Sequence, residues 1–413
     1  MGIKKYIIFT GTISDMGGGQ MYVYNKQKYV ESIGYTPYIF TNRGNNIIIN
    51  GFHLDKVFRY NCLSIFPFLF SEKKQQKIIK SLMADIGYNE GDEIIVESNT
   101  PIISLWGELF TSMTKGKHLA FMIDEHYNIN SNWIDFFNFK FKRGELAGNK
   151  DSTISRIFSG FKDIENSSDY RLSPLCNNVV QNIDNKIVDK IDTNRLVIGS
   201  IGRLDKSYVP SMIKELKIFA NNHKNLLIQY VFIGGADKKT EKKVRNSFKS
   251  FKNVNLLVTG FIYPIPEKIL GKINIFISVA GSATLSWLYN IPTISLDVND
   301  YEPIGVLGYT TKATIYRDKK REFSTSQLLD KIFFENYLSN LVYEKKEKIE
   351  VNQNYFDHHF DFLNRSNNCQ EYYNLNLIKL SSRDNFIKRI LCVVPLDIYI
   401  FIRDTIRKIK SMI

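Results

Sequence analysis

The stretch that decides the fold is Leu196–Lys206, which reads Leu-Val-Ile-Gly-Ser-Ile-Gly-Arg-Leu-Asp-Lys. Its apolar, β-branched run stops at Gly202 and an arginine follows at once, which is typical of a buried parallel strand that enters a basic loop and then a helix. Ligands of parallel sheets bind at the carboxyl ends of the strands, where backbone N–H groups and a helix N-terminus favour phosphate. The polar segment Gln181–Asn194 precedes this stretch and is predicted to link two α/β domains.

The composition agrees with two domains. At 413 residues the chain is too long for one ordinary core, and an apolar content of 44% is enough for well-buried sheets. The formal net charge of +13 indicates an acidic partner, and nucleic acid, anionic lipid and the phosphates of a nucleotide sugar all qualify. Most of the lysines lie in Lys/Asn/Ile-rich stretches, which we interpret as solvated surface.

Cysteine usage and hydropathy predict a cytoplasmic protein. The four cysteines lie far apart without CxxC pairing, so neither a zinc site nor a disulfide framework is expected. The apolar run Tyr6–Phe9 is too short for a signal peptide, and no segment approaches the ~20 apolar residues of a membrane span. Leu391–Ile402 comes nearest, but it contains Pro395 and Asp397. Contact with a membrane surface stays open.

The chain begins with a strand, a glycine loop, a helix and a second strand. The strands are predicted at Lys4–Thr10 and Tyr38–Thr41, and the loop Gly11–Gln20 contains the triplet Gly17–Gly19. Glycines let backbone amides approach a ligand closely, because they add no side chain. The spacing is not the GxGxxG dinucleotide fingerprint. A flexible loop without a ligand is the alternative.

Further strands of the first half are predicted at Val57–Tyr60, Glu93–Glu97 and His118–Ile123. The last of these runs into Asp124, Glu125 and His126, and two carboxylates with an imidazole at a strand end can supply a general base or bind substrate hydroxyls. The alternative is a polar helix start with Asp124 as its N-cap. The aromatic run Phe136–Phe141 is either core or a surface that faces an acceptor.

The second half repeats an alternation of strands and helices. Strands are predicted at Leu227–Ile233, Val254–Thr259, Ile273–Ser278 and Ile291–Leu296. Helices are predicted at Pro210–Asn221, Lys238–Phe251 and Pro266–Leu270, with a further helix that ends at Tyr289. This alternation predicts a parallel sheet with right-handed crossovers.

The loop Ala280–Thr284 is the second informative stretch. Its small residues allow a tight turn, and Ser282 and Thr284 offer hydroxyls beside the free N–H groups of a helix N-terminus. A diphosphate would fit there, with Arg203 opposite as a charged clamp. Structural capping of the helix is the alternative explanation of Ser282.

These motifs in this order resemble glycosyltransferases of the two-Rossmann-domain GT-B type, closest to the family-4 and family-1-like bacterial enzymes. The resemblance is carried by Gly17–Gly19, Gly202–Lys206, Gly234-Gly235, Val258–Gly260 and Ala280–Pro292, and it covers residues 4–300. It implies that the first domain binds the acceptor and the second binds a nucleotide-diphospho-sugar, UDP- or GDP-linked. The phosphate-contacting arginine of such enzymes corresponds to Arg203. A role in bacterial surface polysaccharide, such as capsule or lipopolysaccharide, is implied by the resemblance alone.

The sequence departs from the family-4 pattern at two positions. Tyr208 stands where a phosphate-binding lysine is usual, and Leu285 stands where the second of two glutamates is usual. The acids considered as replacements are Asp297, Asp300 and Glu302. Two alternatives to sugar transfer therefore stay open, namely a non-catalytic GT-B-like scaffold and a sugar-nucleotide epimerase on the same fold.

The expected protein is an α/β glycosyltransferase with two Rossmann-like domains that face each other across a cleft. Its domains are an acceptor-binding domain at 1–185, a donor-binding domain at 195–345 and C-terminal helices at 346–413. The expected donor-binding residues are Gly18, Gly19, Arg203, Lys206, Gly234, Gly260, Gly281, Ser282, Ala283, Thr284 and Glu302. Asp124, Glu125 or His126 would orient or deprotonate the acceptor. Closure about the linker would exclude water.

Neither a metal nor a cofactor is expected, because no DxD motif is placed to demand a cation and the arginine, Lys206 and backbone N–H groups can stabilise the leaving diphosphate. The tail 385–413 has isoleucines at Ile402, Ile406 and Ile409 with cations between them, which predicts a basic amphipathic helix for an anionic membrane surface. Such a tail would bring a lipid-linked acceptor within reach at the inner face of the cytoplasmic membrane. Alternatively, it packs back on the first domain, as GT-B C-terminal helices often do. Nucleic acid is not an expected partner, because no recognised motif is present.

Overall fold

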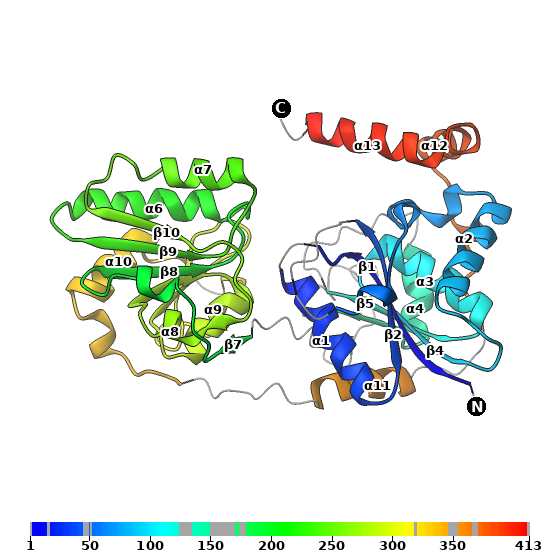
Figure 1. Ribbon diagram of the computed structural model, residues 1–413, viewed down its shortest axis with the longest axis horizontal. Helices are drawn as coiled ribbons and strands as arrows, with labels where there is room; N and C mark the ends of the chain where they lie inside the picture. Colours follow the sequence, from blue (N-terminus) through cyan, green and yellow to red (C-terminus); the bar gives the residue numbers. More distant parts are fainter. Residues whose placement is uncertain are drawn as a thin grey trace. The chain divides into compact units, whose positions relative to one another are not determined.

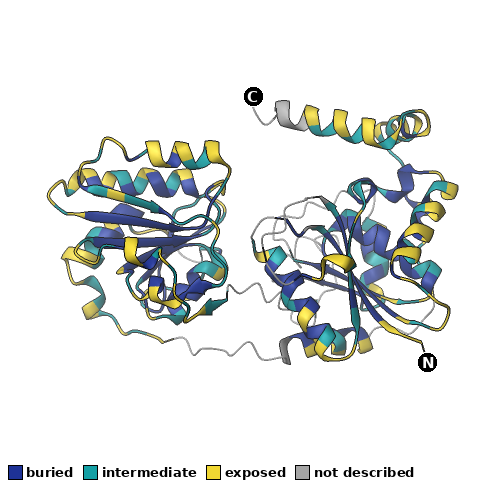
Figure 2. Ribbon diagram, in the orientation of Figure 1, coloured by how far each residue is buried: buried dark blue, intermediate teal, exposed yellow. Residues whose placement is uncertain are grey.

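The computed structural model describes residues 2–14, 17–43, 49, 52–123, 134–148, 170–172, 179–317, 320–345, 354–365 and 371–410. The chain forms two compact units, each an α/β sandwich with helices on both faces of a sheet (Figure 1). The first unit contains Met1–Asp15, Tyr22–Leu175 and Val351–Ile413, and the second contains Met16–Met21 and Cys176–Glu350. In both units the central strands of the sheet are buried (Figure 2).

The first unit has a six-stranded parallel sheet in the order β3-β2-β1-β4-β5-β6. Its strands are β1 (Lys4–Thr12), β2 (Thr36–Arg43), β3 (Val57–Arg59), β4 (Glu93–Ser98), β5 (Lys117–Met122) and β6 (Leu146–Gly148). Its first helices are α1 (Gly18–Ser32), α2 (Glu72–Asp85), α3 (Pro101–Thr114) and α4 (Ile134–Lys142). The strand order reverses between β1 and β4, as it does in a Rossmann domain.

The local sequence explains these elements. The four residues from Tyr6 to Phe9 in β1 are all fully buried, because a central parallel strand is covered on both faces. Helix α3 begins at Pro101, where a missing N–H is tolerated, and ends at Lys115 in the left-handed region. The five strands predicted in this half are confirmed, whereas the short edge strand β6 was not predicted.

The second unit also has a six-stranded sheet, in the order β10-β9-β8-β12-β13-β14. Its strands are β8 (Leu196–Ile201), β9 (Ile228–Ile233), β10 (Val254–Val258), β12 (Ile275–Ser278), β13 (Thr293–Leu296) and β14 (Pro303–Val306). Its helices are α6 (Val209–Asn222), α7 (Lys238–Asn246), α8 (Glu267–Leu270), α9 (Ala280–Leu288) and α10 (Thr325–Phe334). The strand order reverses between β8 and β12, so this unit is also Rossmann-like.

The predicted strands of the second sheet pair in parallel, and the sheet has one further edge strand that was not predicted. Strand β14 pairs with β13 in the antiparallel direction. It begins at Pro303, which cannot donate a backbone hydrogen bond and is therefore tolerated at a sheet edge. Helix α7 is also shorter than predicted and ends at Asn246, five residues before the aromatic Phe251 that packs against the core.

The predicted linker Gln181–Asn194 is part of the second unit rather than a free connection. Its first residue lies in β7 (Val180–Gln181), which pairs with β11 (Ile265–Pro266). Val188 and Ile191 are buried in the same apolar cluster as residues of β8 and β9. Polar residues dominate the segment, but these apolar side chains fix it to the second unit, and closure about this segment stays a prediction.

The C-terminal segment belongs to the first unit. It forms α11 (Asn354–Arg365), α12 (Ser382–Val393) and α13 (Leu396–Lys410). Leu375, Ile378 and Leu391 are buried in the core of the first unit. The tail is therefore not a separate body, and the alternative that it packs back on the first domain is confirmed. Two Rossmann-like domains in one chain, with the last helices returned to the first, constitute the GT-B organisation. No helix among the described residues is long and apolar enough to cross a membrane.

Candidate functional site

A glycine follows the carboxyl end of each of the strands β8, β9 and β10. Gly202, Gly234 and Gly260 all have positive φ angles, of 152°, 151° and 72°. A bridge pairs Gly234 with Gly260, and the Gly202 N–H donates to the carbonyl oxygen of Ile233 at 3.1 Å. A Cβ atom on Gly234 would lie 2.0 Å from the carbonyl oxygen of Gly202. Glycine is therefore required here, because only a bare backbone lets the loops meet at this edge.

Arg203 and Lys206 lie in the turn between β8 and α6. The guanidinium Nε of Arg203 donates to Oδ1 of Asp205 at 3.0 Å, and the arginine side chain is 28% exposed. Lys206 is exposed, and its N–H donates to the carbonyl oxygen of Arg203 at 3.3 Å. The arginine is thus held at the sheet edge with its side chain partly exposed, and a guanidinium group in such a position is suited to bind an anion.

Tyr208 has a structural position. It is the N-cap residue of α6, and its hydroxyl group donates to the carbonyl oxygen of Ile201 at 3.3 Å. The hydroxyl lies 2.3 Å from the point that a Cβ atom on Gly202 would occupy, so the tyrosine fills the space beneath the loop. Burial raises the pKa of Tyr208 to about 12. Tyr208 therefore packs against the loop and supports its conformation.

Helix α9 starts at the neighbouring strand end with an uncapped first turn. Its N-cap residue is Val279, and no side chain caps the helix, so capping does not explain Ser282. Ala280 has a φ of 52°, and its N–H donates to the carbonyl oxygen of Thr314 at 2.7 Å. Gly281 is exposed with open space around its Cα atom, and Ser282 is partly exposed. The first N–H groups of a helix have no intrahelical partner and carry the positive end of its dipole.

The arginine loop and the start of α9 flank the topological switch point of the second sheet. They follow β8 and β12, which are adjacent strands although they are not consecutive in the chain. The Ser278 hydroxyl donates to the carbonyl oxygen of Ile201 at 3.3 Å, which ties the two strand ends together. Ligands of open α/β sheets bind at this kind of crevice. We therefore regard the switch point between β8 and β12 as the candidate site, and the roles assigned to its residues stay predictions.

The acids considered as replacements for the family's glutamates have structural partners. Asp297 is buried, and its carboxylate accepts from the N–H groups of Asn299 and Arg317, each at 2.7 Å. Asp300 forms an ion pair with Arg317, and Glu302 forms one with Arg321 at 2.5 Å.

Leu285, at the position of the second glutamate, is buried among apolar side chains of the core. The apolar environment of this position gives no stabilisation to a charged group.

The predicted acceptor residues Asp124, Glu125 and His126 lie outside the described residues. Gly18 and Gly19 are the first two residues of α1 rather than part of the loop before it. Within the described residues, no three His, Cys, Asp or Glu side chains are grouped so as to hold a metal ion.

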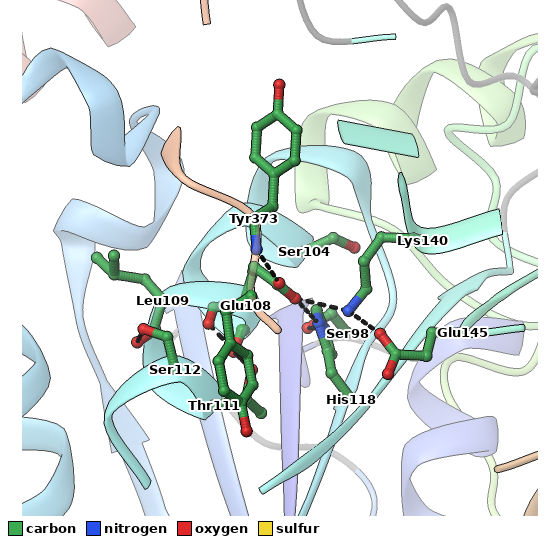
Figure 3. A network of polar contacts seen from close by, with 12 residues as sticks. Ser98, Ser104, Glu108, Leu109, Thr111, Ser112, His118, Lys140, Glu145 and Tyr373 are labelled. Carbon is green, nitrogen blue, oxygen red and sulfur yellow. Dashed lines mark hydrogen bonds and ion pairs between the residues drawn. The ribbon is translucent and has the colours of Figure 1, made fainter. Parts of the chain in front are cut away.

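Sequence reasoning missed a buried ionic network in the first unit. Ser98 Oγ is 3.0 Å from Nε2 of His118, and Nδ1 of His118 is 3.1 Å from Glu108 Oε2 (Figure 3). Lys140 donates to Glu108 at 2.6 Å and also contacts Glu145. Serine, histidine and glutamate in this order resemble a hydrolytic triad, but all three are buried. The arrangement is structural, because no substrate can reach the serine.

Burial and neighbouring charged groups shift the pKa values of the ionisable residues in this network. Burial lowers the pKa of His118, which favours the neutral imidazole. Burial alone would raise the pKa of Glu108, but Lys140 and His118 hold it well below its usual range. The backbone N–H of Tyr373 donates to Glu108 at 2.8 Å, so the network also anchors the C-terminal segment (Figure 3). A glutamate in the middle of the apolar run Pro101–Phe110 was the available sequence signal.

A second buried cluster surrounds Glu97 at the end of β4. Its carboxylate accepts from the hydroxyl groups of Tyr6 and Tyr22, both at 2.6 Å, and lies 3.6 Å from the ammonium group of Lys26. The ammonium group also faces several aromatic rings, among them Phe356 of α11 at 4.8 Å. Burial lowers the pKa of Lys26 to about 8 and raises that of Tyr6. This cluster therefore binds helix α11 to the first sheet.

Comparison with known proteins finds similar solved structures. No family model matches the chain, and no curated protein matches it. The structure is similar to that of UDP-GlcNAc 2-epimerase from Neisseria meningitidis bound to UDP-GlcNAc, with 14% identity and a TM-score of 0.44 over 88% of this chain and 100% of that chain. It is similar to S. aureus MnaA with UDP, with 12% identity and a TM-score of 0.48 over 88% and 99%. It is also similar to the lipopolysaccharide outer core galactosyltransferase WaaB, with 15% identity and a TM-score of 0.43 over 70% and 80%.

Proposed function

We propose that the protein is a glycosyltransferase that moves a sugar from a nucleotide-diphospho-sugar to a hydroxyl group of a glycan or a lipid-linked saccharide. In this reaction the bond between the anomeric carbon and the diphosphate oxygen breaks, and a bond to the acceptor oxygen forms. The acceptor's proton passes to a base, and the nucleoside diphosphate leaves as an anion. Stabilising the charge that develops on the leaving diphosphate is therefore the main task of the donor site.

The observation that carries this proposal is the pairing of Arg203 with the uncapped start of α9 at one switch point. A partly exposed guanidinium and a set of oriented N–H groups are the two kinds of donor that a diphosphate binds best. The glycines Gly202, Gly234 and Gly260 keep this sheet edge free of Cβ atoms. At the end of β4 in the first unit, Glu97 and Ser98 are instead buried and hydrogen-bonded.

Each residue of the donor site then has a defined task. Arg203 and Lys206 bind the diphosphate from the β8 side. The N–H groups of Gly281 and Ser282 at the start of α9, with the hydroxyls of Ser282 and Thr284, bind it from the α9 side. Glu302 would orient the sugar from the loop before β14, and its ion pair with Arg321 fixes that loop. We propose that these groups act without a metal and that Asp124, Glu125 or His126 orients or deprotonates the acceptor.

The wider setting follows from the family resemblance. A UDP- or GDP-linked donor and a role in bacterial surface polysaccharide are proposed on that ground. A lipid-linked acceptor would require work at the inner face of the cytoplasmic membrane, with an anionic membrane surface as partner of residues 385–413.

The first test is a thermal-shift screen of the full chain with UDP, GDP, CMP and TDP. One nucleotide is expected to raise the Tm, and Arg203→Ala is expected to remove most of the shift and to weaken binding about tenfold or more. Arg195→Ala is the matched control. Arg195 pairs with Asp192 in the same way, but it lies at the opposite end of β8. Equal loss in both variants, or no shift with any nucleotide, would contradict the donor site.

One alternative has an observation in its favour. Tyr208 and Leu285 occupy structural positions, so two binding groups that are usual in family 4 are absent from the fold. A non-catalytic scaffold would bind the nucleotide without turnover. Incubation with donor sugars, with and without an acceptor extract, separates the cases. Transfer gives an acceptor-dependent release of nucleoside diphosphate, an epimerase converts the donor sugar without any acceptor, and a scaffold does neither.

A further inference from the structure

The C-terminal helices α12 and α13 are held to the first unit by one face. Leu391 of α12 is buried in the core, and Leu396 and Ile400 of α13 pack against the same cluster. The guanidinium group of Arg403 donates to the carbonyl oxygen and the hydroxyl group of Ser64, at 3.1 and 3.0 Å. The orientation of α13 on the domain is therefore fixed by both apolar packing and hydrogen bonds.

The opposite face of α13 is apolar and exposed. Ile398, Phe401, Ile402 and Ile406 all face solvent, and Phe401 is 72% exposed. At 100° per residue these four positions form one stripe on the side away from Leu396, Ile400 and Arg403. Figure 2 shows the exposed residues along this helix.

Helix α12 contributes to the same kind of surface. Phe386 and Val393 are 64% and 85% exposed, and they lie on one side of the helix together with the exposed cations Arg383 and Arg389. Across the described residues, sixteen large apolar side chains are exposed, and six of them fall between Phe386 and Ile406. We call these six, Phe386, Val393, Ile398, Phe401, Ile402 and Ile406, the outer face. Such a concentration marks an interaction surface.

The charge of the segment identifies the partner. Residues 382–410 carry seven cations and three acids. Arg403 and Asp404 pair with each other, which leaves six cations and two acids, and one of those acids, Asp384, completes the capping box of α12. A second copy of the chain would bring two positively charged segments together, which disfavours self-association. An anionic surface with an apolar layer beneath it matches both the exposed apolar side chains and the positive charge of this segment.

We propose that the outer face docks in the plane of an anionic membrane, with its aromatic and aliphatic side chains in the headgroup region and its cations on the phosphates. This deepens the proposed function, because it specifies how the acceptor-binding domain would meet a lipid-linked acceptor. Vesicle binding is measured without nucleotide or acceptor, so its failure leaves the donor-site test unaffected.

The experiment is co-sedimentation of the full chain with vesicles of phosphatidylcholine, with and without phosphatidylglycerol. The chain is expected to bind the anionic vesicles and to dissociate as salt rises. Phe401→Ser with Ile402→Ser is expected to weaken this binding about tenfold or more, because two inserted side chains are lost. Arg383→Ser with Arg389→Ser is expected to weaken it about tenfold on anionic vesicles only. Both pairs of changes are at exposed positions, so the Tm should stay within about two degrees of the wild type.

The matched control is Lys242→Ser with Arg245→Ser on α7. It removes two exposed cations from a helix that has no exposed large apolar side chain. Binding should change by less than about twofold. The proposal is overturned if the wild type does not bind anionic vesicles, or if the α7 variant loses as much binding as the α12 variant. It is also overturned if sedimentation without lipid shows a dimer that Phe401→Ser with Ile402→Ser dissociates.

Discussion

Polar groups at the carboxyl edge of the second sheet differ from polar groups inside the first unit in their hydrogen-bond and ion-pair partners. At the β8–β12 switch point, glycines remove side chains, α9 has no side-chain cap, and the Arg203 side chain is partly exposed. In the first unit, Glu97 and Glu108 are buried and bound by tyrosine, lysine and histidine side chains of the same unit. The same domain type thus pairs its polar groups internally in the first unit, whereas in the second unit we propose that a sheet edge presents donors to a ligand.

The difference shows which features of a Rossmann-like domain indicate binding. An ionisable cluster by itself is a poor guide, because the clusters around Glu97 and Glu108 in the described part of the chain are buried. A binding edge is indicated by a helix start without a side-chain cap, positive-φ glycines and a partly exposed arginine at a switch point. The buried clusters contribute stability instead, but only while each group keeps its partner.

The largest expected effect is in the first unit. Glu108→Ala removes the carboxylate that binds Lys140, His118 and the Tyr373 N–H, and it leaves an ammonium group buried with one partner fewer. We expect the free energy of unfolding to fall by about 3–5 kcal/mol. Urea denaturation followed by circular dichroism measures this change.

The control for that variant is Glu335→Ala on the second unit. It removes the exposed partner of Lys331 four residues earlier in the chain, and it should change stability by less than about 0.5 kcal/mol. If Glu108→Ala is as mild as this control, the ionic network does not stabilise the first unit and the contrast between the two units fails.

The next effect concerns the glycine edge of the second unit. Gly234→Ala forces a Cβ atom to within 2.0 Å of the Gly202 carbonyl oxygen at a φ of 151°. We expect a loss of about 2–4 kcal/mol in the free energy of unfolding, because the loop must shift and strain remains. Nucleotide binding should weaken as well. Thermal unfolding with and without nucleotide gives both quantities.

Gly281→Ala is the matched variant at the same edge. A Cβ atom there meets open space, so stability should be unchanged within about 0.5 kcal/mol. Weaker nucleotide binding with normal stability would indicate that a ligand approaches Gly281 closely. Equal destabilisation by both alanines would show that the edge is not shaped as described.

Much of the fold could be predicted from the sequence because buried parallel strands are nearly continuous apolar runs. Leu196–Ile201 and Tyr6–Phe9 carry that signal without help from distant residues. Strand β14 and the packing of Val188 and Ile191 could not be predicted, because they depend on tertiary partners. The network around Glu108 joins residues up to 265 positions apart, which no local pattern reports. The candidate donor residues could be proposed from the sequence, because glycines and an arginine at strand ends are local features.

A smaller effect concerns pH. Lys26 has a pKa lowered to about 8 by burial, so between pH 8 and its unfolded value the unfolded chain binds more protons than the folded one. Stability therefore rises with pH in this window, and Lys26 should add about 1–2 kcal/mol between pH 7.5 and 9.5. Lys26→Met should remove this rise in urea denaturation, whereas Lys28→Met, an exposed lysine on the same helix, should preserve it. The same slope in Lys26→Met as in the wild type would assign the rise to other groups.

The smallest effect tests whether Tyr208 supports the donor loop from below or takes part in binding. Tyr208→Phe removes one long hydrogen bond to the Ile201 carbonyl oxygen and keeps the ring, so stability should fall by about 0.5–1 kcal/mol and nucleotide affinity should change less than about twofold. Tyr230→Phe is the matched control, because its hydroxyl donates to the Leu216 carbonyl oxygen at 2.7 Å in the same core. If Tyr208→Phe alone lowers affinity tenfold with little loss of stability, the hydroxyl binds the donor directly. The tyrosine hydroxyl would then replace the lysine ammonium group as the group that binds the donor. The scaffold alternative rests on Tyr208 and Leu285, and it would lose the first of them.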